Sequence, residues 1–153
     1  MEQSSIEGLN PQPKTEDEQL QIERERLMLD TKVNFFTKTE KQIMFRAKLK
    51  QLRHIFSELE EDKKEIIDNI IQSVAFMTVE LKNLEEVIKL NGQVERYKNG
   101  SCQSGYKKSA ASDAYNSMKK TFVADVKLLT EQLNVTNAQT TTSDELLAFI
   151  KSK

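Results

Sequence analysis

The chain has 153 residues, of which 37% are hydrophobic and 31% charged, and its formal net charge is −1. This length suggests one domain, and a net charge near zero excludes a global field that would draw the protein onto nucleic acid. No stretch approaches the ~20 apolar residues of a membrane span, and the N-terminus lacks a basic-then-apolar signal pattern. We therefore expect a soluble, intracellular protein.

Proline and glycine are confined to a few places. Both prolines lie in the polar segment 1–14, and three of the four glycines lie between Gly92 and Gly105. Proline and glycine destabilise a helix interior by roughly 3 and 1 kcal/mol relative to alanine. The chain is therefore predicted to be all-α, with a disordered tail at 1–14 and long helices interrupted once.

The N-terminal region, 15–56, is predicted to be helical. Thr15 and Glu18 have the spacing of a capping box, which predicts a first helix from there to about Phe35. A second helix is predicted from about Thr39 to Phe56, on a looser apolar stripe. A turn between the two helices is left open, because Asp30, Thr31, Asn34 and Thr37 are poor helix formers.

Residues 57–134 are predicted to form a long antiparallel helical hairpin, similar to a coiled coil. A third helix should begin near residue 61 and end at Asn91-Gly92, and a fourth should begin near Ser109. Apolar residues recur along both at spacings of three and four. The predicted seam and oligomerisation core contains Ile67, Ile70, Val74, Met77, Leu81, Leu84, Ile88, Tyr115, Met118, Phe122 and Leu129.

This seam has two interpretations, because a hairpin alone leaves a second apolar edge of the third helix uncovered. That edge contains Ile66, Ile71, Phe76 and Val87. Either the first two helices cover it or identical subunits do, and we favour assembly of the helices into an oligomeric ring.

Two further segments have patterns of their own. In the loop 92–109, residues before and after Asn99-Gly100 are compatible with a short two-stranded β-ribbon. Segment 135–153 is predicted to be a flexible linker followed by an amphipathic tail, whose apolar residues are Leu146, Leu147, Phe149 and Ile150. Such a tail either folds back on its own domain or binds a partner, and we favour the partner.

Basic residues cluster in 37–54 and in the loop. The candidates for DNA binding are Lys38, Lys41, Arg46, Lys48, Lys50, Arg53, Arg96, Lys98, Lys107 and Lys108. Cations on neighbouring helix faces can contact phosphates. The alternative is that those of 37–54 pair with acids in 15–26 or 57–65, while the loop cations solvate a tight turn.

Catalysis finds little support in the sequence. His54 is the only histidine and Cys102 the only cysteine, so neither a metal site nor a nucleophile with a base is easily built. We expect no catalytic residue, no metal and no cofactor, and a protein that is not an enzyme.

From Phe56 to Leu133 the chain contains an ordered set of short segments, which covers about half of the chain. They are Phe56-Ser57-Glu58-Leu59, Asp62-Lys63-Lys64, Ala75-Phe76-Met77, Leu81, Val94-Glu95-Arg96-Tyr97-Lys98-Asn99-Gly100, Gly105-Tyr106-Lys107-Lys108-Ser109, Tyr115-Asn116-Ser117-Met118-Lys119-Lys120, Phe122 and Lys127-Leu128-Leu129. In their order and spacing they resemble the small terminase subunits of tailed bacteriophages that infect low-GC Gram-positive bacteria. A proline that usually follows the Lys-Lys-Ser of such proteins is replaced by Ala110 in this chain.

The resemblance implies a non-enzymatic genome-packaging factor in the cytoplasm of the host bacterium. Small terminases assemble into rings, bind the packaging site on double-stranded viral DNA and recruit and regulate the large subunit, which is the ATPase and nuclease. The alternative from composition and periodicity is a helical oligomeric adaptor or scaffold without DNA binding.

Overall fold

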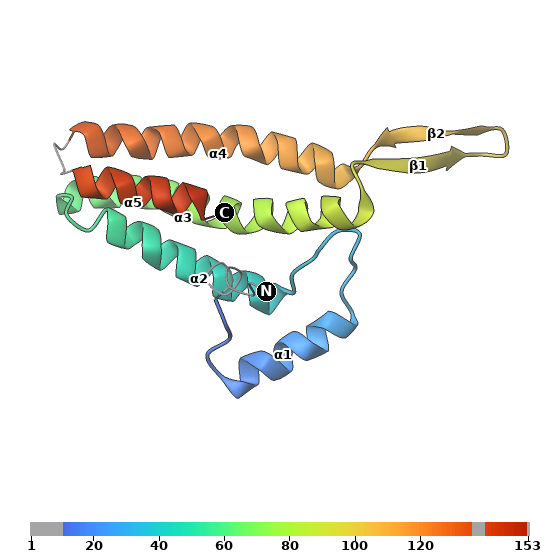
Figure 1. Ribbon diagram of the computed structural model, residues 1–153, viewed down its shortest axis with the longest axis horizontal. Helices are drawn as coiled ribbons and strands as arrows, with labels where there is room; N and C mark the ends of the chain where they lie inside the picture. Colours follow the sequence, from blue (N-terminus) through green and yellow to red (C-terminus); the bar gives the residue numbers. More distant parts are fainter. Residues whose placement is uncertain (1–10, 136–139, 153) are drawn as a thin grey trace, which may run out of the picture.

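The computed structural model describes residues 11–135 and 140–152. Across them it is mostly helical, with five helices and one two-stranded antiparallel sheet, which confirms the helical class and the ribbon (Figure 1). The elements are α1 (Glu16–Leu27), α2 (Lys38–Ile55), α3 (Glu61–Asn91), β1 (Val94–Asn99), β2 (Gln103–Lys108), α4 (Ala110–Val135) and α5 (Thr140–Lys151). None of the described helices is both long and apolar enough to cross a membrane.

Helices α3 and α4 run antiparallel, and the ribbon β1–β2 extends beyond the end where they meet (Figure 1). Val74 and Leu81 of α3 are fully buried against α4, where Phe122 and Leu129 are also buried. Most of the remaining seam residues are half-buried. Gly92 ends α3 with a φ of 88°, a left-handed conformation that favours glycine.

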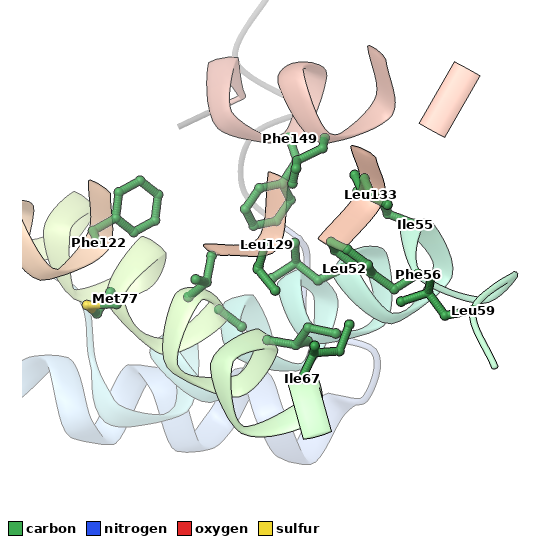
Figure 2. Packing of buried hydrophobic residues seen from close by; sticks show 14 of the residues in the cluster. Leu52, Ile55, Phe56, Leu59, Ile67, Met77, Phe122, Leu129, Leu133 and Phe149 are labelled. Carbon is green, nitrogen blue, oxygen red and sulfur yellow. The ribbon is translucent and has the colours of Figure 1, made fainter. Parts of the chain in front are cut away.

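Helix α2 packs on the other side of α3 and completes the core (Figure 2). It begins one residue before the predicted start, because Thr37 and Glu40 form a capping box in which each side chain accepts a hydrogen bond from the other residue's backbone N–H. Leu52 and Phe56 lie in the same buried cluster as Ile71.

The prediction that the first helix continues to Phe35 is wrong. Thr15 caps α1 as expected, but the helix ends at Leu27 and none of its residues is buried. Residues 28–37 form a loop, within which Asp30 accepts a hydrogen bond from the backbone N–H of Lys32. Such local bonding by aspartate competes with helix formation.

The C-terminal segment folds back on the chain instead of extending from it. Figure 2 shows Phe149 of α5 reaching towards Leu129 of α4 and Leu52 of α2. Leu146 and Phe149 keep only 2% and 1% of their surface exposed. The predicted linker is helical at both ends, and its centre lies outside the described residues, as does most of the predicted tail at 1–14.

Candidate nucleic-acid interface

Two of the predicted DNA-binding arginines of α2 form ion pairs within the chain. Arg53 makes a two-pronged contact with Asp68 of α3, with Nε–Oδ1 and Nη2–Oδ2 distances of 2.9 and 3.0 Å. Arg46 Nη2 lies 2.6 Å from Glu18 Oε1 of α1. Hydrogen bonds from these arginines lower the pKa values of the Asp68 and Glu18 carboxyl groups. Both arginines therefore hold neighbouring helices to α2.

Two lysines of α2 also form contacts within the chain. Lys41 Nζ lies 3.0 Å from Glu80 Oε2 of α3 and donates a hydrogen bond to Asn34. Lys48 Nζ lies 5.1 Å from the centre of the Phe149 ring and donates to Ser152 Oγ, at the end of α5. Burial lowers the pKa of Lys48, and Lys82 nearby adds to the effect.

The alternative interpretation of the basic segment, pairing with acids in 15–26 or 57–65, holds for Arg46 alone among the ion pairs that the structure describes. Arg46 pairs with an acid of 15–26, as that interpretation requires, and Arg53 with Asp68, three residues beyond 57–65. Within the part of the chain that the structure describes, Lys38 and Lys50 are the two candidates of α2 that are exposed and form no ion pair.

The other four candidates lie on the ribbon. Its strands pair in the register Val94–Lys108 to Asn99–Gln103, and Gly100 turns the chain between them with a φ of 68°. Every residue of β1 is exposed, as is all of β2 except the half-buried Gly105. The ribbon therefore contributes nothing to the hydrophobic core.

Two of these four residues form ion pairs with acids, and two do not. Lys107 Nζ lies 3.0 Å from Glu95 Oε1 on the paired strand, and Lys108 Nζ lies 2.8 Å from Asp113 Oδ1 at the start of α4. Arg96 and Lys98 have no acidic partner among the described residues. They stand two residues apart on one strand, so their backbones are about 7 Å apart and their side chains share a face.

Sequence reasoning missed two aromatic residues of the ribbon as contact candidates. Tyr106 is 77% exposed and pairs with Arg96 across the strands, and Tyr97 is 40% exposed. The sequence signal for them is the alternation of side chains along a strand. From Val94 onwards, every second residue lies on the same face of the ribbon.

The second apolar edge of α3 is only partly covered. Ile71 and Val87, which the hairpin alone was expected to leave uncovered, are 3% and 1% exposed within the single chain. Ile71 packs in the core cluster that α2 completes. Ile66 and Phe76 are 73% and 53% exposed. Phe76 also borders a groove of about 830 Å³ between α1, the 28–37 loop, α2 and α3.

The residues considered for other chemistry give no second site. His54 and Cys102 are both exposed, and Cys102 is a free thiol near the ribbon turn. No group of three or more His, Cys, Asp or Glu side chains able to hold a metal ion occurs among residues 11–135 and 140–152.

The predicted partner-binding tail offers little surface. Leu146 and Phe149 are core residues, Ile150 is half-buried, and Leu147 is 49% exposed. The assignment of Leu146 and Phe149 to a partner is therefore corrected, because the apolar face of α5 is already buried against α2 and α4.

No model of a known protein family matches the chain, and neither the curated proteins nor the solved structures contain a match.

Proposed function

We propose that this protein is a small terminase subunit, a non-enzymatic factor that binds viral DNA and recruits the large terminase in the bacterial cytoplasm. The observation that supports the proposal is the position of the loop that carries part of the ordered set of family motifs. The ribbon formed by β1 and β2 is exposed except at Gly105, carries two unpaired cations and projects from the end of a long helical hairpin (Figure 1).

Exposed cations on a projecting element are suited to polyanion binding. They can reach phosphates without any rearrangement of the core, and each contact adds to a salt-sensitive affinity. The positive charge of the ribbon can attract phosphates locally, although the chain as a whole carries a net charge of −1.

Assembly into a ring is the second part of the proposal. The large exposed side chains of Ile66 and Phe76 on α3 support it, because burying such residues against another copy is favourable. Coiled-coil packing between subunits would use the same helices. We assign no contact residue for the large subunit, since most of the apolar surface of α5 is already buried.

The alternative is a helical adaptor without DNA binding. It is favoured by the number of candidate cations that the fold uses internally, since five of the ten form ion pairs with acids. An adaptor would use the exposed apolar residues in the same way but would have no affinity for duplex DNA.

Two measurements on the purified full chain separate the proposals. Light scattering should give a multiple of the 17.6 kDa chain mass. Fluorescence anisotropy with labelled duplex DNA should give binding at low salt, with an affinity that falls steeply as the salt concentration rises. An oligomer with no salt-sensitive binding supports the adaptor, and a monomer without binding rejects both.

A further inference from the structure

The two faces of the ribbon carry different chemistry. Side chains alternate between the faces of a strand, and the register sets which residues of β1 and β2 share a face. One face, which we call the cationic face, carries Val94, Arg96, Lys98, Ser104, Tyr106 and Lys108. The other, which we call the closed face, carries Glu95, Tyr97, Asn99, Gln103, Gly105 and Lys107.

On the closed face, the charged side chains pair with each other and the aromatic ring packs on the ribbon itself. Glu95 and Lys107 neutralise one another across the strands. A methyl group added at Gly105 would lie 3.1 Å from Cε1 of Tyr97, so the Tyr97 ring lies across the Gly105 backbone. The absence of a side chain at Gly105 gives the ring this position. The closed face has no unpaired charge, because its two charged residues, Glu95 and Lys107, pair with each other.

The cationic face lacks such internal partners. It contains no acidic residue of its own, and its one ion pair joins Lys108, at the base of the ribbon, to Asp113 of α4. Arg96 and Lys98 are exposed, and Tyr106 beside Arg96 leaves 77% of its surface in contact with solvent. Desolvating this face is favourable only against a partner that supplies negative charge and a surface for an aromatic ring.

We propose that the cationic face of the ribbon lies in a groove of duplex DNA, with Arg96 and Lys98 contacting the DNA and Tyr106 packing against it. This inference rests on the proposed function and names the contacting surface. The major groove of B-form DNA is about 12 Å wide and admits a two-stranded β-ribbon, whose strands are about 4.8 Å apart. The ribbon projects clear of the helices, so it can enter a groove before the helical body meets the phosphates (Figure 1).

The proposal separates the ribbon from α2, the other described element that carries predicted DNA-binding cations without an ion pair. Lys38 and Lys50 of α2 are exposed like Arg96 and Lys98, but they lie on a helix packed into the body of the protein. Two pairs of equal charge therefore give a matched experiment. If only the overall charge mattered, removing either pair would weaken binding equally.

The experiment compares Arg96→Gln/Lys98→Gln with Lys38→Gln/Lys50→Gln on the same duplex, by anisotropy over a range of salt concentrations. We expect the ribbon variant to bind about tenfold or more weakly and to lose salt dependence for each lost phosphate contact. The α2 variant should stay within about threefold of the wild type. Neither pair is buried, so light scattering and thermal unfolding should be unchanged in both.

The contribution of Tyr106 is tested with a separate variant. Tyr106→Ala removes no charge, so it should weaken binding while leaving the slope of affinity against salt unchanged. Duplex RNA serves as a further competitor, because the deep, narrow major groove of A-form RNA does not admit a ribbon. Competition by RNA as strong as that by DNA would overturn the groove assignment.

The outcomes distinguish this inference from the proposed function. If the wild type does not bind DNA at low salt, the proposed function itself fails. If the wild type binds and the two double variants are equally weakened, or only the α2 variant is weakened, DNA binding stands and the ribbon assignment is wrong. A weakened ribbon variant beside an unaffected α2 variant supports the assignment.

Discussion

The side-chain Oδ1 of Asn83 on α3 accepts a 3.1 Å hydrogen bond from the backbone N–H of Phe36, and a second from that of Phe35. Asn83 is 1% exposed, and Phe36 is itself buried beside Met44 and Val79. One buried amide therefore satisfies two backbone donors of the loop that leads into α2.

Replacing Asn83 should destabilise the fold by about 2–3 kcal/mol. Asn83→Leu leaves both loop N–H groups without their acceptor at a partly or fully buried site, and each such loss costs about 1–3 kcal/mol. The free energy of unfolding, measured by urea denaturation, should fall accordingly. The matched control is Asn69→Leu at an exposed position of the same helix, which should change it by no more than about 0.5 kcal/mol. Equal effects of the two variants would contradict the role of Asn83.

Helix α5 should detach when its buried aromatic ring is removed. Phe149 is 1% exposed and lies beneath the Lys48 ammonium group, so Phe149→Ala removes both apolar burial and the cation–π contact. We expect faster amide exchange throughout α5, with little change at the centre of α3, because the loss is relieved by local opening. The comparison is Leu147→Ala, on the same helix and half-exposed. If Leu147→Ala accelerated exchange as much as Phe149→Ala, the docking of α5 would be wrong.

The helical hairpin and the ribbon could be predicted because their signals are local. The heptad spacing lies within single helices, α3 and α4. The ribbon is indicated by Asn99-Gly100 and the residues directly around it. The capping function of Thr15 was local too. The end of α1 has a local signal in Asp30, but the loop after it is also held by Asn83, 47 residues from Phe36 in the sequence.

The sequence identified the candidate cations by residue type, but it did not show which of them are free of contacts within the chain. Lys48, Arg53 and Arg96 look equivalent in the sequence. They differ because Lys48 meets Ser152, 104 residues away, and Arg53 meets Asp68 on the next helix, whereas Arg96 stands on a ribbon with no helix packed over it. Which cation remains free depends on tertiary contacts that amphipathic patterns do not encode.

Acid should weaken the contact between α2 and α3 in a defined direction. The hydrogen bond from Arg53, with help from Gln72, lowers the pKa of Asp68 below its ordinary 3.8. A carboxyl with a depressed folded-state pKa stabilises the fold above its unfolded pKa, and that stabilisation is lost as the pH falls through the folded-state value. The pair is partly exposed, so we expect an effect of at most about 1 kcal/mol.

The measurement is the free energy of unfolding of wild type and Arg53→Gln from pH 6 down through the carboxyl range. The difference between the two proteins should be constant above about pH 5 and shrink below about pH 4. A Lys50→Gln variant removes a cation that has no ion pair on the same helix, and its difference from wild type should show no such pH dependence. A difference that widens on acidification would contradict a depressed pKa at Asp68.

Salt should loosen α1 before any other described helix. None of its residues is buried, and it is held to α2 by polar contacts: Arg26 with Glu40, Glu18 with Arg46, and Glu25 with the backbone N–H and hydroxyl of Thr39. At about 1 M salt the screening length falls to about 3 Å, which weakens such exposed pairs. Amide exchange in α1 should therefore accelerate with salt while that in α3 stays constant, and Arg46→Gln should reproduce part of the acceleration at low salt. Salt-independent exchange in α1 would show that these ion pairs do not hold it.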